Sequence, residues 1–168
     1  MIEICILYCL TKREMTIYSV RKRIEEYFGA FTMPSHGTIH PALKRFEEEK
    51  FVTVRETLSD GGKKSSYYGI TEKGKKHLCK LLLSELSENP SVSINEIYIR
   101  LSASGILSEE QKKELKQLCE RYLDLYITAI ERKINDQYSG IDNFQKQVMA
   151  KISSNQKEFI SFIKTLGD

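Results

Sequence analysis

The sequence predicts a mainly α-helical protein with one small β-hairpin, and three observations support this fold class. Apolar residues recur at helical spacing over most of the 168 residues. Residues 51–70 instead alternate β-branched and polar side chains around an Asp-Gly turn, as hairpins do. Hydrophobic residues make up 40% and charged residues 29% of the chain, which is typical of a globular protein. We expect two domains, over residues 1–87 and 91–168, joined by a short linker.

The first predicted helix covers residues 2–11 and is strongly apolar. It lacks the basic start and the small-residue cleavage site of a secretory signal, so we expect a buried helix in a cytoplasmic protein. No later run approaches the roughly 20 apolar residues of a membrane span. Cys5 and Cys9 share one face of this helix, and with Cys79 and Cys119 they are expected to be reduced, buried thiols. A metal or redox site at the Cys5–Cys9 pair is the alternative.

The second predicted helix begins after Thr16 as N-cap, continues to Phe28 and is stopped by Gly29. After a short connection, residues 34–50 form a third helix, and Ile39, Leu43 and Phe46 lie on one stripe of it that can face a core. Two helices joined by a tight turn in this way predict a helix-turn-helix arrangement.

The opposite face of the third helix is polar and slightly basic, with no carboxylate before Glu47. Such a face suits a helix that enters a DNA groove. The residues on it are Ser35, His36, Thr38, His40 and Lys44. Pro41 leaves the start of the helix open: either Ser35 caps it and Pro41 lies in its second turn, or Thr38 caps it and Pro41 is its third residue.

The hairpin is predicted from two strands, residues 51–58 and 65–70, with Lys63 and Lys64 in the turn between them. Tyr67 and Tyr68 must face opposite sides of the strand, so one packs on the helices and the other can touch a ligand or a phosphate. Thr71 then caps a further helix, expected to pack through Leu78, Leu82 and Leu86. Together these elements predict a winged helix-turn-helix domain.

Three segments resemble the PadR family of winged helix-turn-helix transcriptional regulators and cover most of residues 15–75. They are IYSVRKRIEEYFG, PSHGTIHPALKRFEEEKFV and DGGKKSSYYGITEKG. The matching positions are Ser35, Gly37, Thr38, Ile39, Pro41, Leu43, Arg45, Glu47, Gly61-Gly62, Tyr67-Tyr68 and Thr71-Glu72-Lys73-Gly74. The resemblance implies that the third helix begins near Ser35 and tolerates Pro41. It also implies a homodimeric repressor that binds double-stranded DNA and is released by a small-molecule effector.

The chain departs from the family pattern at His36, His40, Lys50 and Ile17, where the family has Pro, Tyr, Gly and commonly Gly. His36 and His40 lie on the face assigned to DNA, so the resemblance implies DNA binding but does not indicate which operator sequence is preferred. Their i,i+4 spacing also allows a shared metal, but Gly37 stands where the zinc-protease signature needs Glu, and we expect no metal site.

We expect two kinds of DNA contact. Thr38, His40 and Lys44 are the candidates for base edges, because the first turns of such a helix enter deepest. The remaining DNA-binding candidates, placed on phosphates or beside the helix start, are Tyr18, Ser35, His36, Lys63, Lys64 and Tyr67.

Beyond residue 87 the sequence predicts three helices whose starts carry capping boxes: Ser93 with Glu96, Ser108 with Gln111, and Asp142 with Gln145. The last two helices, separated by a break at Ser139-Gly140, have apolar seams wide enough for two partners. We expect a helical hairpin that pairs with another copy, as the family's C-terminal helices do; folding back on the N-terminal domain is the alternative. The proposed dimerisation residues are Tyr122, Tyr126, Phe144, Val148, Ile152, Phe159 and Phe162.

Charge agrees with this division. Residues 1–86 carry 15 Lys+Arg against 11 Asp+Glu, whereas residues 87–168 carry 11 against 12, so a polyanion is expected to meet the N-terminal half. An enzyme is not expected, because the sequence offers no nucleophile with a base at recognisable spacing, no phosphate loop and no metal or cofactor signature. The rival hypothesis is a protein-interaction adaptor that uses the same scaffold without reading DNA.

Overall fold

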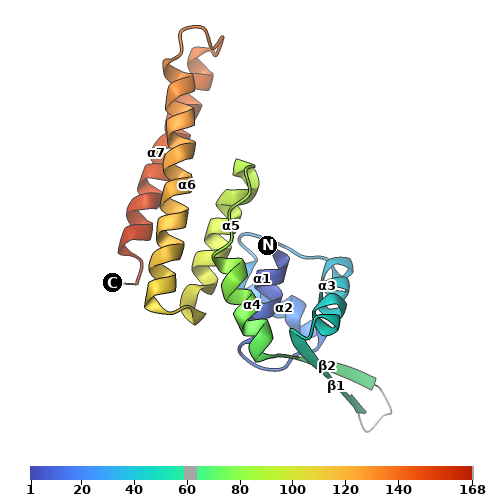
Figure 1. Ribbon diagram of the computed structural model, residues 1–168. Helices are drawn as coiled ribbons and strands as arrows, with labels where there is room; N and C mark the ends of the chain where they lie inside the picture. The colour runs from blue at the N-terminus through green and yellow to red at the C-terminus, as the bar shows by residue number, and fades with distance from the viewer. Residues whose placement is uncertain (59–63, 168) are drawn as a thin grey trace. The chain divides into compact units, whose positions relative to one another are not determined.

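The computed structural model describes residues 1–58 and 64–167 and confirms a mainly helical fold with one antiparallel β-hairpin (Figure 1). The elements in chain order are α1 (Ile2–Leu10), α2 (Ile17–Phe28), α3 (His36–Glu48), β1 (Val52–Leu58), β2 (Lys64–Ile70), α4 (Glu72–Leu82), α5 (Pro90–Ala103), a single 3-10 turn η1 (Ser104–Ile106), α6 (Glu109–Asn135) and α7 (Asn143–Thr165). They form two compact units, Met1–Leu107 and Ser108–Asp168.

Helix α1 is the centre of the first unit and contacts α2, α3, α4, α5 and β2. Its apolar sequence is explained by this position, since six of its nine residues are buried. Cys5 and Cys9 are among them, and burial raises the pKa of each thiol from 9.0 to about 12. Both therefore stay protonated at neutral pH and pack as small apolar groups.

The helix starts predicted for α2 and α3 are confirmed. Thr16 caps α2, and its hydroxyl accepts the Ser19 N–H at 3.3 Å. Ser35 is the N-cap of α3, so Pro41 lies inside the helix as the family resemblance implied. The Ser35 hydroxyl shares a 2.9 Å hydrogen bond with the Thr38 hydroxyl instead of accepting a backbone N–H.

Strands β1 and β2 pair from Val52 with Ile70 to Leu58 with Lys64. The base of the hairpin is tied to the loop after α1, because Met15 and Tyr68 exchange both backbone hydrogen bonds, at 3.0 and 2.8 Å. Tyr68 is buried here, which also raises its pKa, whereas Tyr67 on the other face is half-buried. The prediction that the two tyrosines face opposite sides and that one of them packs on the helices is therefore confirmed, with Tyr68 as the packed one.

Three predicted boundaries need correction. Helix α4 ends at Leu82, so Leu86 lies beyond it in the following connection. Helix α5 begins after Asn89, whose side chain accepts the Ser91 N–H, with Pro90 at the first helical position. Ser93 is instead a buried residue inside α5, and its hydroxyl donates to the Asn89 carbonyl at 3.1 Å. The first compact unit consequently includes α5 and continues past residue 87, where the sequence placed its end.

The second unit is a hairpin of α6 and α7, and both predicted capping boxes are present at its helix starts. Residues buried in it come from both helices: Leu115, Cys119, Leu123, Ile127, Ile130, Ser153, Phe159, Ile160 and Ile163. Other apolar side chains remain outside, with Leu125, Phe144, Val148 and Phe162 between 50% and 79% exposed. This unit therefore has a second apolar face that its own packing does not cover.

Candidate nucleic-acid interface

Helix α3 separates its apolar and polar residues as the sequence predicted. Ile39, Leu43 and Phe46 are at most 1% exposed and anchor the helix to the core of the first unit. Thr38, His40 and Lys44 are exposed on the other side. Because the buried stripe fixes the rotation of the helix about its axis, these three side chains stay exposed, with Thr38 on one flank of the stripe and His40 and Lys44 on the other. The side chain of His36 lies outside the described part of the chain.

The N-terminus of α3 adds backbone donors to this surface. The first N–H groups of any helix have no intrahelical acceptor, and here the Ser35 hydroxyl is engaged with Thr38. An exposed hollow of about 210 Å³ lies beside this end, lined by Arg21, Glu25, Met33, Pro34 and Ser35. The backbone N–H groups and the Arg21 guanidinium suit an anionic group such as a phosphate, whereas the Glu25 carboxylate in the same lining opposes one.

Helix α2 places two further groups near this end. Tyr18, at its second position, is 69% exposed. Arg21 follows one turn later on the same side and lines the hollow with Ser35. Sequence reasoning selected Tyr18 and missed Arg21, although the i,i+3 spacing of the two residues on the polar face of α2 could have indicated it.

The hairpin projects from the unit beside the end of α3 (Figure 1). Lys64 is exposed, and its ammonium group lies 3.7 Å from the Glu56 carboxylate, a contact too exposed to hold it firmly. The Arg55 guanidinium stands 5.2 Å from the centre of the Tyr67 ring and donates to Glu14 at 2.9 Å. Arg55, on β1, is a second cation of the hairpin that the sequence analysis did not select. Lys63 and the Asp-Gly turn lie outside the described residues.

The carboxylates of α3 lie at its C-terminal end. Glu47, Glu48 and Glu49 are exposed in its last turn, more than two turns from Thr38. Arg45, which points to the same end, is paired with Glu3 of α1. The start of α3 thus carries no carboxylate of its own, and the helix dipole favours an anion at this end.

A separate hollow of about 440 Å³ opens on the first unit between α1, α2 and α5. Tyr8, Tyr27 and Phe28 form an edge-to-face cluster in its wall, with ring centres 5.7 to 6.3 Å apart. The Lys12 ammonium lies 4.7 Å from the centre of the Tyr8 ring. Glu26 and Ser102 complete the lining, so the hollow combines an aromatic wall with one cation and one carboxylate.

Two classes of site find no support in the described part of the chain. No group of three or more His, Cys, Asp and Glu side chains there is arranged to hold a metal ion. Among the same residues, no helix is both long enough and apolar enough to cross a membrane.

Comparison with known proteins gives consistent matches. The sequence model of the transcriptional regulator PadR-like family matches residues 6–80. The negative transcriptional regulator PadR of Bacillus subtilis is 24% identical over 173 residues, which span 98% of this chain and 94% of that protein. The crystal structure of Bacillus subtilis PadR in complex with operator DNA is 20% identical, with a TM-score of 0.49 and coverage of 98% of this chain and 95% of that one. A PadR-like transcriptional regulator from Bacillus cereus is 33% identical, with a TM-score of 0.40 and coverage of 47% and 75%.

Proposed function

Because the chain belongs to the PadR-like family of transcriptional regulators, we propose that it is a homodimeric repressor that binds a pseudo-palindromic operator and is released by a small-molecule effector. The observation that carries this proposal is the orientation of α3. Its apolar stripe is sealed in the core, while Thr38, His40 and Lys44 stand exposed beside a helix start rich in donors.

In the proposed complex the first turns of α3 lie in the major groove. Thr38 and His40 have the hydrogen-bonding groups, and Lys44 the charge, that base edges and nearby phosphates require. Tyr18, Arg21 and the N–H groups after Ser35 hold the backbone on one side of the groove. His36 is the first residue of α3 and so belongs to the end of the helix that enters this groove. On the other side the hairpin provides Lys64, Tyr67 and, in the turn, Lys63.

Dimerisation is proposed through the uncovered apolar face of the second unit. Among the predicted dimerisation residues, Phe144, Val148 and Phe162 are exposed, and Tyr122, Tyr126 and Ile152 are half-buried. Phe159 belongs to the core of the unit, since it is only 8% exposed, and is removed from the proposed contact surface. A row of large exposed apolar groups is unusual on a monomer and favours a partner.

The dimer is tested by sedimentation velocity on the double variant Phe144→Ser/Phe162→Ser, which we expect to sediment as a monomer at a concentration where the wild type is a dimer. Leu58→Ser is the matched control, because Leu58 is also an exposed apolar residue, 68% accessible, but belongs to the hairpin of the first unit. A wild-type protein that sediments as a monomer would contradict this part of the proposal.

Repression is supported by the Bacillus subtilis relative, which is a negative transcriptional regulator. Release requires an effector that binds one arrangement of the two recognition helices more tightly than another. We assign it to the hollow walled by Tyr8, Tyr27 and Phe28, whose rings can stack on an effector, and whose charged lining residues are Lys12 and Glu26. Tyr27→Ala should then leave operator binding intact and make the protein insensitive to the effector.

The proposal is tested by fluorescence anisotropy of purified protein with the DNA upstream of its own gene, at moderate salt, followed by footprinting. Two protected half-sites, about 34–36 Å or one helical turn apart, are expected from a two-fold dimer with one α3 in each major groove. Binding that is equally weak to this DNA and to unrelated duplexes would favour the adaptor hypothesis instead.

A further inference from the structure

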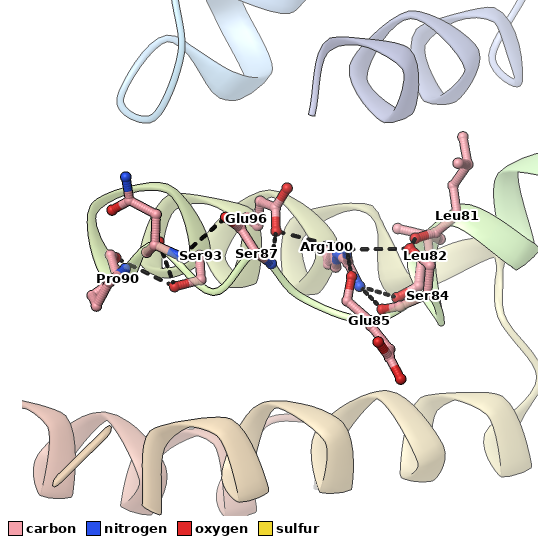
Figure 2. A network of polar contacts seen from close by, with 10 residues as sticks. Leu81, Leu82, Ser84, Glu85, Ser87, Pro90, Ser93, Glu96 and Arg100 are labelled. Atoms are coloured by element: carbon pink, nitrogen blue, oxygen red, sulfur yellow. Dashed lines mark hydrogen bonds and ion pairs between the residues drawn. The ribbon is translucent and has the colours of Figure 1, made fainter. Parts of the chain in front are cut away.

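Two charged side chains of α5 hold the connection that leads into it from α4. Residues 83–89 have no helix or strand of their own. Arg100 and Glu96, one turn apart on α5, lie over this connection, with side chains only 4% and 15% exposed (Figure 2). We call this pair the α4–α5 latch.

Arg100 binds the end of α4 through several atoms at once. Its guanidinium donates to the carbonyl of Leu82 at 3.4 Å, to the carbonyl of Glu85 at 3.0 Å, and to the hydroxyl of Ser84 at 3.3 Å. It also donates to the Ser84 carbonyl. These carbonyls include the unsatisfied acceptors that every helix C-terminus leaves, and their partial negative charge favours a cation.

Glu96 holds the other end of the connection. Its carboxylate accepts the backbone N–H of Ser87 at 3.0 Å and lies 3.8 Å from the Arg100 guanidinium. The dashed lines in Figure 2 therefore run from one helix turn of α5 to both ends of the segment between Leu82 and Ser87. The connection is fastened along its length by two side chains that also bind each other.

The latch fixes the orientation of α5 relative to the end of α4, which apolar packing alone does not. Ile97 and Leu101 pack α5 into the first unit, but apolar contacts are non-directional and tolerate small rotations and shifts. A planar guanidinium with donors in a rigid fork has a single arrangement that serves several carbonyls together. Buried ion pairs often add little stability compared with apolar groups of similar size, so a buried arginine here is better explained by the orientation that it imposes.

Helix α5 is also the only covalent route from the DNA-reading elements to α6 and α7, because the chain passes from α4 through α5 and η1 to Ser108. In a dimer joined through the second unit, the direction of α5 relative to α4 therefore contributes to the separation of the two α3 helices. We propose that Arg100, held by Glu96, is the positioning residue that selects the spacing between operator half-sites. This inference rests on the proposed function and names a determinant of its specificity.

The test compares duplexes that differ in spacing alone. The footprinted operator, the same duplex with one or two base pairs inserted between the half-sites, and a duplex with one half-site scrambled are titrated by fluorescence anisotropy. Two half-sites bound together should exceed one by about 100-fold, and most of this gain is lost when geometry prevents joint binding. For the wild type we expect the inserted base pairs to abolish most of that gain.

In Arg100→Met we expect the affinity for the scrambled duplex to stay within about twofold of wild type, while the penalty for an inserted base pair falls to about tenfold or less. Arg100→Lys keeps the charge but loses the fork, and should give an intermediate penalty. Arg132→Met, which removes an exposed arginine from α6, is the control for lost charge. Circular dichroism establishes that each variant is folded.

The outcomes separate the two proposals. Two results with folded Arg100→Met would overturn the role of the latch. One is a spacing penalty as large as that of the wild type. The other is an affinity that falls as much for the scrambled duplex as for the operator. If Arg100→Met does not fold, Arg100→Lys decides, and an unchanged penalty in it overturns the inference. Wild-type protein that binds none of the duplexes overturns the proposed function, and this inference with it.

Discussion

Gly74 is the residue of the winged unit whose replacement has the most clearly defined cost. It lies in the first turn of α4, directly against the backbone at the base of the hairpin. A Cβ at this position would stand 2.1 Å from the Phe51 carbonyl oxygen and 2.8 Å from Ile70 Cγ1. Because real Cβ contacts do not fall below 3.0 Å, the strand or the helix must move by about 0.9 Å, the difference between 3.0 and 2.1 Å.

The displaced carbonyl already has two donors. It accepts the Thr71 N–H at 2.9 Å, and the Thr71 hydroxyl shares its proton between this carbonyl at 3.1 Å and the Lys50 carbonyl at 2.8 Å, so moving the Phe51 carbonyl disturbs the residue that caps α4. Overpacking of this kind costs about 1–3 kcal/mol. A net hydrogen bond contributes about 1 kcal/mol, while alanine regains at most about 1 kcal/mol of helix propensity over glycine. For Gly74→Ala we expect a net loss of about 2 kcal/mol in the free energy of unfolding.

Urea unfolding followed by circular dichroism at 222 nm measures this loss. Gly37→Ala is the matched control, because Gly37 also lies in the first turn of a helix but its Cβ would meet nothing closer than the Ser35 hydroxyl, at 3.7 Å. The control should be as stable as the wild type or slightly more stable. A Gly74→Ala protein with wild-type stability would refute the reasoning, since it would mean that the hairpin base adjusts without cost.

Three further predictions concern single side chains. Lys64→Ala should weaken binding to all duplexes alike and reduce the slope of log affinity against log salt by about 0.9, the value for one lost phosphate contact. Lys113→Ala on α6 is the control and should leave the slope unchanged. An unchanged slope for Lys64→Ala would remove Lys64 from the interface. His40→Ala should change the preferred base pair at one position of each half-site, with about 1–3 kcal/mol of discrimination lost in a selection from randomised half-sites; an identical preference profile would exclude a base contact. Burial raises the pKa of Cys5 and Cys9 from 9.0 to about 12, so on raising the pH the thiols ionise first in the unfolded chain. The free energy of unfolding should therefore be constant below about pH 9 and fall as the pH rises from 9 to 12. The fall is at most about 1.4 kcal/mol per pH unit and thiol. The fall, measured by urea unfolding, should be shallower in Cys5→Ala/Cys9→Ala, and equal slopes would contradict the assignment.

The sequence predicted best those features that depend on local pattern. The two faces of α3 follow from helical spacing alone, and the caps at Thr16 and Ser108 follow from residue type and position. Pro41 was ambiguous because either helix start is sterically allowed, and the resemblance to a known family resolved it. Residue type and spacing were therefore sufficient for the two faces of α3 and for these two caps, but not for the position of Pro41.

Features that depend on contacts distant in sequence were missed. Ser93 and Glu96 have the spacing of a capping box, but Glu96 binds the Ser87 N–H and Asn89 starts the helix. Both sets of residues can begin a helix, and Pro90 directly after Asn89 is the local signal that could have favoured the earlier start. Arg100 has no sequence signal at all, since its partners are the carbonyls of another helix end. On α7, heptad spacing alone did not predict that Phe159 would be buried.

The pairing of Met15 with Tyr68 closes the chain into a ring that contains α2, α3 and the hairpin. The amide hydrogen of Tyr68 is bonded to the Met15 carbonyl, so it can exchange with solvent only when this ring opens. Opening the ring also detaches β2 from the loop after α1. Slow exchange at this amide would thus show that α2, α3 and the hairpin are held together. Substitutions that weaken the pairing of Met15 with Tyr68 should shorten the lifetime of the DNA-binding conformation, even though they change no group that contacts the nucleic acid.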